Sequence, residues 1–555
     1  MGPATDLAGM LATAEAWVAE DPDAQTAAEL RALITAARAG DPAARESLAD
    51  AFNGTLEFGT AGLRGRMGPG SNRMNRVVVM RAAAGLARYL RDTGGHSIVI
   101  GFDARHHSAD FAHDTARIMA GAGIHAMVLP RPLPTPVLAF AIHHVGASAG
   151  VMVTASHNPA HDNGYKVYLG DGSQIVPPAD HEIAARINAV GAIAEIEFSD
   201  DVITLDDSVL DAYVARAVSL VGDGPRTVSC IATALHGVGG DVLRRVVTGA
   251  GFDAPVVVAA QQEPDPDFPT VTFPNPEEAG AMDLALELAR HGSADIVIAN
   301  DPDADRCAAA IPHAADWRML SGDEVGWLLG WWTLERQLRI GEQPHGALAQ
   351  SIVSSDLLRA LANDSGVDYA ATLTGFKWIS RVPGLVFGYE EALGYCVDPS
   401  AVTDKDGITA ALLLLELTAH LKATNRTLQD VLDELALRYG VYVTAQVSVR
   451  VSDLSLIASA MSRLRHTPPS ALAGRTVLRC DDLEEGADGL PPTDGLRFVM
   501  DGARIIVRPS GTEPKLKCYL QVVKQVVGDL GATRDEANRE MRMLREAIAA
   551  ELGLD

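Results

Sequence analysis

Three carboxylates stand at alternate positions in the segment Asn300-Asp-Pro-Asp-Ala-Asp-Arg306. In an extended loop Asp301, Asp303 and Asp305 can converge, and their mutual repulsion would oppose that geometry unless a cation were bound. Hard oxygen ligands of this kind suit Mg²⁺, which also takes phosphate oxygens as ligands. An EF-hand opens with the same alternation, but it needs Gly at its sixth position and Glu at its twelfth, where this chain has Arg and Pro. The segment predicts a magnesium site, and a solvated acidic turn is the alternative.

A serine follows the apolar run Gly150-Val-Met-Val-Thr154, which is typical of a buried strand. Pro159, three residues after Ser156, stops an immediate helix and holds the loop open. With a phosphate nearby, Ser156 would accept and donate a phosphoryl group, and an ordinary turn is the alternative. The hydrolase pattern G-x-S-x-G also occurs, at residues 146–150. It follows a helical segment and precedes a strand, the reverse of a nucleophile elbow, so we set it aside.

The segment Asp162 to Gln174 predicts a strand, a Gly-containing turn and a return strand. Side chains alternate between the two faces of a strand, so Lys166 and Tyr168 are expected on the same face. Lys166 is a candidate for assisting proton transfer or for neutralising a phosphate. An exposed surface lysine is the alternative.

A guanidinium, two hydroxyls and a glycine occur together in Arg508-Pro-Ser-Gly-Thr-Glu-Pro-Lys515. Arg forms bidentate charge-assisted bonds to phosphate, and glycine exposes backbone N–H groups to an anion. The segment predicts a non-covalent phosphate cradle, with a plain turn between strands as the alternative.

Two further loops contain charged side chains that are weaker evidence. Phe58 to Gly65 is a glycine-rich turn that presents Arg64, and Gly388 to Tyr395 places two carboxylates after the apolar strand 385–387. Carboxylates in such a loop can accept hydrogen bonds from sugar hydroxyls. A plain surface turn is the simpler interpretation of either loop alone.

Apolar β-branched runs alternate with amphipathic helical segments, which favours α/β domains with largely parallel sheets. Residues 1–50 have helical spacing, and from about Val441 strands with short connections precede a long helix from Arg534, which predicts a separate α+β domain. The predicted strands of the α/β part are 97–102, 150–154, 227–233 and 294–299. The predicted divisions are 1–50, 51–215, 216–322, 323–440 and 441–555.

Composition limits the kinds of partner. The formal charge of −26 argues against nucleic acid and against an anionic membrane, because both are bound by clustered Lys and Arg. It does not exclude an anionic small molecule held in a local basic pocket. The 5 cysteines are scattered without a CxxC spacing, which indicates free thiols in a reducing compartment. No signal peptide or membrane-spanning run is visible, so a cytoplasmic location is expected.

Taken in order along the chain, these motifs resemble the α-D-phosphohexomutase superfamily. The resemblance rests on the Arg64 loop, the Thr-Ala-Ser-His-Asn-Pro loop, the Asp-x-Asp-x-Asp-Arg loop, the Glu390 loop and the Arg-Pro-Ser-Gly-Thr-Glu-Pro loop. Other details resemble the branch of phosphoglucomutases related to phosphopentomutase. They are the Ala-Leu-Gly-Tyr tail of the glutamate loop, Thr374-Gly-Phe-Lys-Trp378, Asp404-Lys-Asp-Gly407 and the helical N-terminus.

The resemblance implies four domains around a central cleft, three of them α/β with mixed sheets and the C-terminal one α+β. It also implies a resting phosphoserine, one Mg²⁺ per chain and a sugar 1,6-bisphosphate intermediate that turns over between two transfers. The partner would be a small-molecule sugar phosphate, and the chain would be a monomer or a homodimer. The implied catalytic residues are Ser156, His157, Lys166 as proton carrier and Arg64; the metal ligands are Ser156, Asp301, Asp303 and Asp305; the substrate-binding residues are Arg306, Lys377, Glu390, Ala392, Arg508, Ser510, Gly511 and Thr512.

One position departs from the pattern of the superfamily. Many members have Ser where this chain has Ala392, and some have a His soon after, which this loop lacks. The leading hypothesis is a mutase for the 1- and 6-phosphates of glucose, with mannose phosphates as further substrates. A phosphopentomutase for ribose or deoxyribose phosphates is the alternative with the same mechanism. A catalytically silent sugar-phosphate sensor and a metal-dependent phosphatase are the alternatives from other classes.

Overall fold

The computed structural model of the chain describes residues 7–59, 62–451, 454–509 and 515–553. Its contacts divide the chain into two compact units, and one segment from the C-terminal half belongs to the first of them. The first unit comprises Met1–Arg318 and Asp398–Glu416, and the second comprises Met319–Val397 and Leu417–Asp555.

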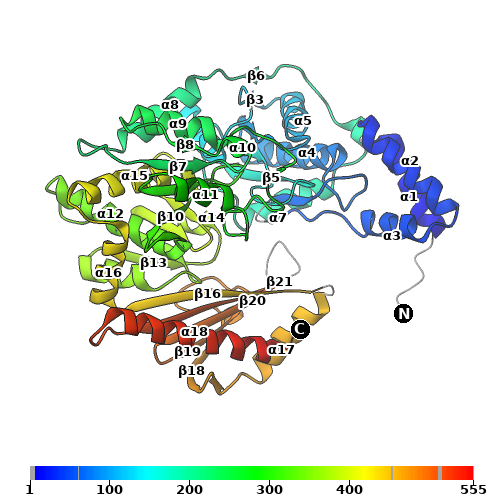
Figure 1. The fold of residues 1–555 in the computed structure, drawn as a ribbon. Helices are drawn as coiled ribbons and strands as arrows, with labels where there is room; N and C mark the ends of the chain where they lie inside the picture. The colour runs from blue at the N-terminus through cyan, green and yellow to red at the C-terminus, as the bar shows by residue number, and fades with distance from the viewer. Residues whose placement is uncertain (1–6, 60–61, 452–453, 510–514, 554–555) are drawn as a thin grey trace. The chain divides into compact units, whose positions relative to one another are not determined.

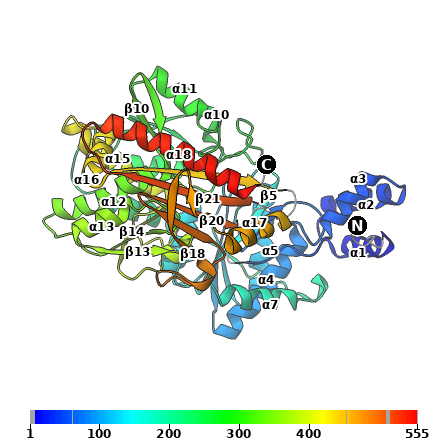
Figure 2. The same cartoon turned by 90° about the horizontal axis from the view of Figure 1, so that it is seen from below.

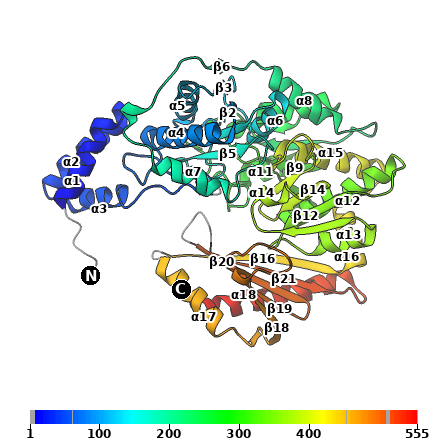
Figure 3. The same ribbon diagram turned by 180° about the vertical axis from the view of Figure 1, so that it is seen from behind.

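Three helices open the first unit, as the helical spacing of the N-terminal segment predicted. An aspartate caps the start of the second and of the third helix. Asp23 accepts from the backbone N–H of Gln25, and Asp41 accepts from that of Ala43, which are typical N-cap bonds. The apolar faces of the three helices share a core with helix α4 (Figure 3). The helices are α1 (Leu7–Glu20), α2 (Ala24–Arg38) and α3 (Pro42–Ala51).

The first sheet has the strand order β1-β5-β4-β2-β3-β6. Strand β2 pairs in parallel with β3 and β4, while β5 is antiparallel to both β4 and β1, so the sheet is mixed. Its strands are β1 (Leu63–Arg66), β2 (Ser97–Phe102), β3 (His125–Val128), β4 (Ala149–Val153), β5 (Asp162–Leu169) and β6 (Ile203–Thr204). The neighbouring helices are α4 (Arg76–Thr93), α5 (Ser108–Gly121), α6 (Thr135–Val145), α7 (Ala179–Asn188), η1 (Ile193–Glu195) and α8 (Ser208–Ser219).

The return strand expected after β5 is not formed. Only an isolated bridge joins Tyr168 to Gln174, and the chain then passes through Pro177 and Pro178 into helix α7. Prolines have no N–H group to donate to a strand ladder, which explains why the pairing ends there. The order helix α6, then strand β4, around residues 146–150 agrees with our rejection of a nucleophile elbow.

A second mixed sheet of the first unit has the order β11-β10-β9-β7-β8, with β7, β8 and β9 parallel and β10 antiparallel to β9. Strand β9 is fully buried and ends one residue before Asn300, as predicted. Its strands are β7 (Cys230–Thr233), β8 (Val256–Val257), β9 (Ile296–Ala299), β10 (Ala308–His313) and β11 (Asp316–Met319). Its helices are α9 (Gly239–Gly249), α10 (Ala259–Gln262) and α11 (Asp283–His291).

The second unit begins with the sheet β13-β12-β14-β15, in which only the β14–β15 pair is antiparallel. Strand β14 continues to Glu390, which pairs with Gly394, so the expected glutamate loop is a turn of three residues. The strands are β12 (Ala347–Ser351), β13 (Asp368–Thr372), β14 (Leu385–Glu390) and β15 (Gly394–Cys396). The helices are α12 (Gly322–Arg339), α13 (Leu357–Ser365), α14 (Phe376–Ile379), α15 (Gly407–Ala423), which starts in the segment assigned to the first unit, and α16 (Leu428–Tyr439).

The C-terminal sheet has the order β16-β21-β20-β19-β18-β17, and each neighbouring pair in it is antiparallel. Helix α18 lies across one face of this sheet, where its apolar side chains join the sheet's core (Figures 1 and 2). The strands are β16 (Val441–Arg450), β17 (Ala471–Leu472), β18 (Arg475–Asp482), β19 (Leu496–Met500), β20 (Ala503–Pro509) and β21 (Lys515–Lys524), and the helices are α17 (Leu454–His466), η2 (Leu483–Glu485) and α18 (Leu530–Leu552).

Three mixed α/β sheets followed by an α+β domain confirm the predicted fold class. The sequence patterns did not reveal helix α17 or strand β18, and the exact domain boundaries remain predictions. None of the helices in the described ranges combines the length and apolar character that crossing a lipid bilayer requires.

Candidate active site

The three aspartates of the acidic loop form a tight, buried cluster. One ligand oxygen from each of Asp301, Asp303 and Asp305 lies within 4.8 Å of the others, and all three side chains are buried. Two hydrogen bonds shape the loop: Arg306 N donates to Asp301 Oδ1 at 3.0 Å, and Thr135 Oγ1 donates to Asp303 Oδ2 at 2.6 Å. The alternation of carboxylates in the sequence therefore does produce convergence at the end of β9.

Cationic side chains surround the cluster. Lys166 Nζ lies 2.7 Å from Asp303 Oδ2 and 3.0 Å from Asp305 Oδ2, and Lys405 Nζ lies 3.1 Å from Asp305 Oδ2. Burial opposes the charged form of Lys166, but the two carboxylates outweigh burial and raise its pKa. The same ammonium groups outweigh the burial of Asp305 and hold its pKa well below the usual range.

Asp301 differs from its two neighbours. Burial, followed by repulsion from Asp303 and Asp305, raises the pKa of Asp301 well above its ordinary value. At Asp301 the neighbouring positive charge of Arg306 does not offset burial and the repulsion from the other two carboxylates.

Two carboxylate oxygens of the cluster lack hydrogen bonds within the described part of the chain, and this supports a metal site. Asp303 Oδ1 and Asp305 Oδ1 are buried and have no hydrogen-bond partner among the residues that the structure describes. The ammonium groups contact the Oδ2 atoms of these side chains, so each carboxylate keeps one oxygen for another ligand. Unpaired buried oxygens are rare because they are costly, and a cation coordinated by oxygen satisfies them. The residues fit Mg²⁺.

Ser156 lies at this cluster. Its Oγ donates to Asp301 Oδ2 at 2.8 Å and lies 3.2 Å from His157 Nδ1. Its backbone has a φ of +53°, a left-handed conformation that residues other than glycine seldom adopt, and such strain is concentrated at functional sites. The expectation that the hydroxyl and the acidic triplet meet is therefore satisfied, within the first unit.

His157 and Arg64 lie in the same surroundings. Burial, helped by the nearby Arg306 and Arg64, lowers the pKa of His157 well below its ordinary value, so the imidazole is neutral. Arg64 lies on strand β1 rather than in the expected turn, because residues 63–66 pair with β5. Its Nη1 is 3.5 Å from Asn158 Oδ1 in the serine loop.

Arg306 lies beside the carboxylates that precede it. Its Nε is 3.9 Å from Asp301 Oδ2 and 3.8 Å from Asp305 Oδ1. At these distances Arg306 contributes positive charge to the cluster.

Sequence reasoning missed Lys405, although its segment was noted as a mark of the branch. Tyr168 OH donates to Asp404 at 2.8 Å, and Tyr213 OH donates to both oxygens of Asp406 at 2.9 Å. These bonds fix the residues on either side of Lys405 and so hold its ammonium at Asp305. The Asp-Lys-Asp run at residues 404–406 was the available signal in the sequence.

The other predicted binding residues belong to the second unit. Gly375 N donates to Glu390 Oε2 at 3.2 Å, and Arg508 donates to Thr374 Oγ1, so both side chains contact the segment between β13 and α14. Lys377 lies on α14, and Ala392 lies in the turn after β14. Three predicted cradle residues lie outside the described part of the chain: Ser510, Gly511 and Thr512.

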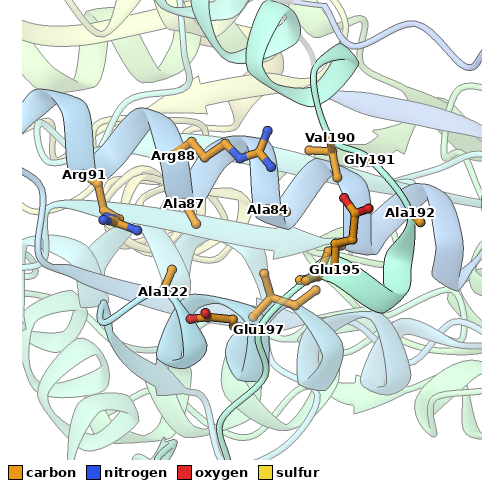
Figure 4. A pocket seen from close by; sticks show the side chains of 12 residues that line it. Ala84, Ala87, Arg88, Arg91, Ala122, Val190, Gly191, Ala192, Glu195 and Glu197 are labelled. Carbon is orange, nitrogen blue, oxygen red and sulfur yellow. The ribbon is translucent and has the colours of Figure 1, made fainter.

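A separate cavity of about 230 Å³ lies against helices α4 and α5 (Figure 4). Arg88 and Arg91 line it together with Glu195 and Glu197, and none of the predicted site residues does. The acidic cluster is therefore distinguished by its chemistry rather than by the volume of a pocket.

Comparisons with known proteins agree with this chemistry. Family models described as phosphoglucomutase/phosphomannomutase match the chain in order: alpha/beta/alpha domain I over residues 55–193, domain II over 211–314, domain III over 321–439 and the C-terminal domain over 447–527.

Three curated relatives cover most of the chain and most of their own length. A Haemophilus influenzae protein named "Probable phosphomannomutase" is 51% identical over 80% of this chain and 92% of its own. A phosphoglucomutase of Staphylococcus haemolyticus is 36% identical over 85% and 91%, and a human phosphopentomutase is 34% identical over 91% and 90%. The names of these three relatives refer to three different sugars.

Solved structures share the fold. A phosphoglucomutase/phosphomannomutase family protein of Burkholderia thailandensis has a TM-score of 0.67 at 20% identity, covering 89% of this chain and 97% of its own. Parafusin of Paramecium, a phosphoglucomutase, has a TM-score of 0.68 at 20% identity, covering 88% and 94%.

The fold and the comparisons define the class as an isomerase of the phosphohexomutase type. The chain belongs to the phosphoglucomutase/phosphomannomutase family, which confirms the resemblance to the α-D-phosphohexomutase superfamily.

Proposed function

We propose that the chain interconverts the 1-phosphate and 6-phosphate of a hexose, glucose or mannose, through a phosphorylated Ser156 and a sugar bisphosphate. The observation that carries the proposal is the contact of Ser156 Oγ with Asp301 Oδ2 at 2.8 Å, inside a buried cluster in which two carboxylate oxygens have no hydrogen-bond partner among the described residues. A hydroxyl in that position, once phosphorylated, would present its phosphoryl group to a cation held by the three aspartates.

The reaction consists of two transfers. In the first, the bond between phosphorus and Ser156 Oγ breaks and a bond to the free sugar hydroxyl forms, which leaves a bisphosphate. After the bisphosphate has turned over, its other phosphoryl group returns to Ser156 and the isomeric monophosphate leaves. Catalysis of such transfers depends mainly on positioning and on charge stabilisation.

The surrounding groups have distinct roles in this scheme. Bound Mg²⁺ would be held by Asp301, Asp303 and Asp305 and would neutralise charge on the phosphoryl oxygens. Arg64, and Arg306 beside it, would stabilise the same oxygens. Carrying a proton requires the Lys166 ammonium to lose one against the attraction of two carboxylates.

The charge on Lys166 therefore favours neutralisation of the phosphoryl oxygens, the second role foreseen for it. The neutral ring of His157, 3.2 Å from Ser156 Oγ, is a second candidate for the proton carrier.

The residues of the second unit would bind the substrate. Glu390 would accept hydrogen bonds from sugar hydroxyls, with Lys377 and the backbone at Ala392 as neighbours. Arg508, with the cradle residues that follow it, would bind the phosphate that is not being transferred. Arg508 contacts Thr374 and Glu390 accepts from the next residue, Gly375, so these two predicted binding residues lie at the same segment.

The choice of a hexose over a pentose is supported by the identities of two relatives. The relative named "Probable phosphomannomutase" is 51% identical to this chain, whereas the human phosphopentomutase is 34% identical. Steady-state kcat/KM on glucose 1-phosphate, mannose 1-phosphate and ribose 1-phosphate tests it. We expect the hexose phosphates to exceed ribose 1-phosphate by at least ~10-fold, and the reverse order would identify a phosphopentomutase.

The phosphoserine is tested separately. Incubation with glucose 1,6-bisphosphate and Mg²⁺ should add one phosphoryl group to the intact protein, detected by mass spectrometry and mapped to Ser156. Absence of the modification at that residue would remove Ser156 from the mechanism.

A further inference from the structure

Arg105 is a buried cation beneath the serine loop that the proposed mechanism does not use. Its side chain is 1% exposed, and it lies in the connection 103–107 between β2 and α5. Its guanidinium lies among carbonyl oxygens of the loop that follows β4. An arginine has five N–H donors in a fixed planar arrangement, so it can bind several oxygens at once.

Four of those donors point to one short stretch of backbone. Nη2 donates to the carbonyls of Ser156 and Asn158, both at 2.6 Å. Nη1 donates to the carbonyls of Pro159 at 2.8 Å and Asp162 at 3.2 Å. The loop from the nucleophile to the start of β5 is thus bonded to a single side chain.

The guanidinium is itself fixed in place. Asp103 Oδ2 lies 3.4 Å from Arg105 Nε, and Asp103 Oδ1 accepts from Ser108 Oγ at 2.7 Å and from Arg105 N at 3.0 Å. The guanidinium carbon lies 4.9 Å from the centre of the Phe268 ring, which stacks against it. Arg105 therefore presents its donors in one orientation.

The loop needs such a support. Ser156 has a φ of +53°, and conformations of this kind persist only where the surroundings impose them. Bonds to the carbonyls of Ser156 and Asn158 fix the peptide groups next to the nucleophile, and hence the direction of Oγ toward Asp301.

We propose that Arg105 is a positioning residue for phosphoryl transfer: it holds the loop so that Ser156 Oγ faces the acidic cluster. The inference rests on the proposed role of Ser156 as the nucleophile. The hydrogen bonds of Arg105 go to the serine loop, including the carbonyl of Ser156 itself, and its positive charge also interacts with Asp303. Its proposed effect on the reaction is through the position of the loop.

The chain offers a matched control in Arg226. This side chain also donates to backbone carbonyls, those of Gly222 at 2.5 Å, Gly224 at 3.2 Å, Pro225 at 3.1 Å and Ala250 at 2.7 Å. It also stacks on a phenylalanine, 5.0 Å from the ring centre of Phe252. The loop that it binds carries no predicted site residue.

The experiment compares Arg105→Met, Arg105→Lys and Arg226→Met in the full-length protein. We expect Arg105→Met to lower kcat by at least ~100-fold with KM changed less than ~3-fold, because small misplacement of a reacting group costs about that much. Phosphorylation of Ser156 by glucose 1,6-bisphosphate should slow equally. The Kd for Mn²⁺ should stay within ~2-fold in Arg105→Lys, because that variant keeps the positive charge that interacts with Asp303. Arg226→Met should lower the Tm without lowering kcat more than ~3-fold.

Arg105→Lys keeps the charge but has a different donor geometry, so we expect a Tm near that of the parent and a kcat reduced at least ~10-fold. This variant decides the question if Arg105→Met does not fold. A kcat of Arg105→Lys within ~2-fold of the parent would overturn the proposal, as would equal kcat losses in Arg105→Met and Arg226→Met. Failure of Ser156 as the nucleophile would appear separately, as retained turnover in Ser156→Ala.

Discussion

Each of the two units contains a serine hydroxyl that donates to a buried carboxylate. In the first, Ser156 Oγ lies 2.8 Å from Asp301 Oδ2, and in the second, Ser354 Oγ lies 2.9 Å from Glu391 Oε2. Burial is the largest cause of a raised pKa at both carboxyl groups. Judged by this one hydrogen bond, the two serines are equivalent.

Their surroundings differ. Glu391 Oε2 also accepts from Ser351 Oγ at 3.0 Å, so hydroxyl groups satisfy it. Around Asp301 there are two more carboxylates, each with one oxygen that has no hydrogen-bond partner within the described ranges. The proposed nucleophile thus differs from Ser354 in the neighbouring carboxylate oxygens without hydrogen bonds to described residues, and not in its own hydrogen bond.

Removing each hydroxyl is the strongest way to break the comparison. Ser156→Ala should lower turnover by at least ~10⁴-fold, because the covalent intermediate cannot form. Ser354→Ala should keep most of the activity and lower the free energy of unfolding by about 1–2 kcal/mol, since Glu391 loses one donor. Coupled assays and denaturant unfolding measure both. Comparable activity losses in the two variants would show that the surroundings do not distinguish them.

Neutralising one carboxylate in each cluster tests the role of charge. Asp303→Asn should weaken Mn²⁺ binding by roughly 100-fold or more, because it removes the charge of a ligand, while Glu391→Gln should change the Kd by less than ~2-fold. Isothermal titration calorimetry on the full-length protein measures both. A loss of metal affinity in Glu391→Gln of the size seen in Asp303→Asn would contradict the assignment of the metal site.

Asp406 sharpens the comparison, because it is a hydroxyl-bonded carboxyl group in the first unit. Burial raises its pKa from 3.8 to about 6. The folded state therefore binds this proton more tightly than the unfolded state, and the free energy of unfolding should fall as the pH rises from 3.8 to about 6, by up to ~3 kcal/mol. This loss in the free energy of unfolding is complete once the pH is well above about 6.

Unfolding by urea at pH 4, 5, 6 and 7 measures this contribution, with Asp406→Asn as the reference. The free energy of unfolding of the parent should fall relative to that of Asp406→Asn as the pH rises from 4 to about 6. A constant difference across the four pH values would mean that Asp406 does not titrate there.

The sequence predicted the components of the site better than their assembly. Asp301, Asp303 and Asp305 were found because alternate carboxylates after a buried strand have few other uses, and Ser156 because it ends a similar strand. That β4 and β9 bring them together did not follow from periodicity, since the strands lie in different sheets. That Ser156 would lie close to the three aspartates was expected only from the order of the motifs along the chain.

Residues that depend on distant contacts were missed for the same reason. Lys405 follows the acidic loop by about a hundred residues, and its place at Asp305 depends on the folded chain, in which Tyr168 and Tyr213 bind the residues on either side of it. Local patterns also misjudged lengths. Strand β14 continues through Gly388 to Glu390, because pairing with β15 outweighs the low strand preference of glycine.

The assignment of Asp398–Glu416 to the first unit affects any attempt to divide the protein. A fragment that ended at Arg318 would lack Lys405, leaving Asp305 with one ammonium fewer and the hydroxyls of Tyr168 and Tyr213 without their carboxylate acceptors. The first unit is therefore not one contiguous segment of the polypeptide chain. Truncation, domain exchange and separate expression would all disturb the charge balance of the acidic cluster unless the 19 residues Asp398–Glu416 were kept with the first unit.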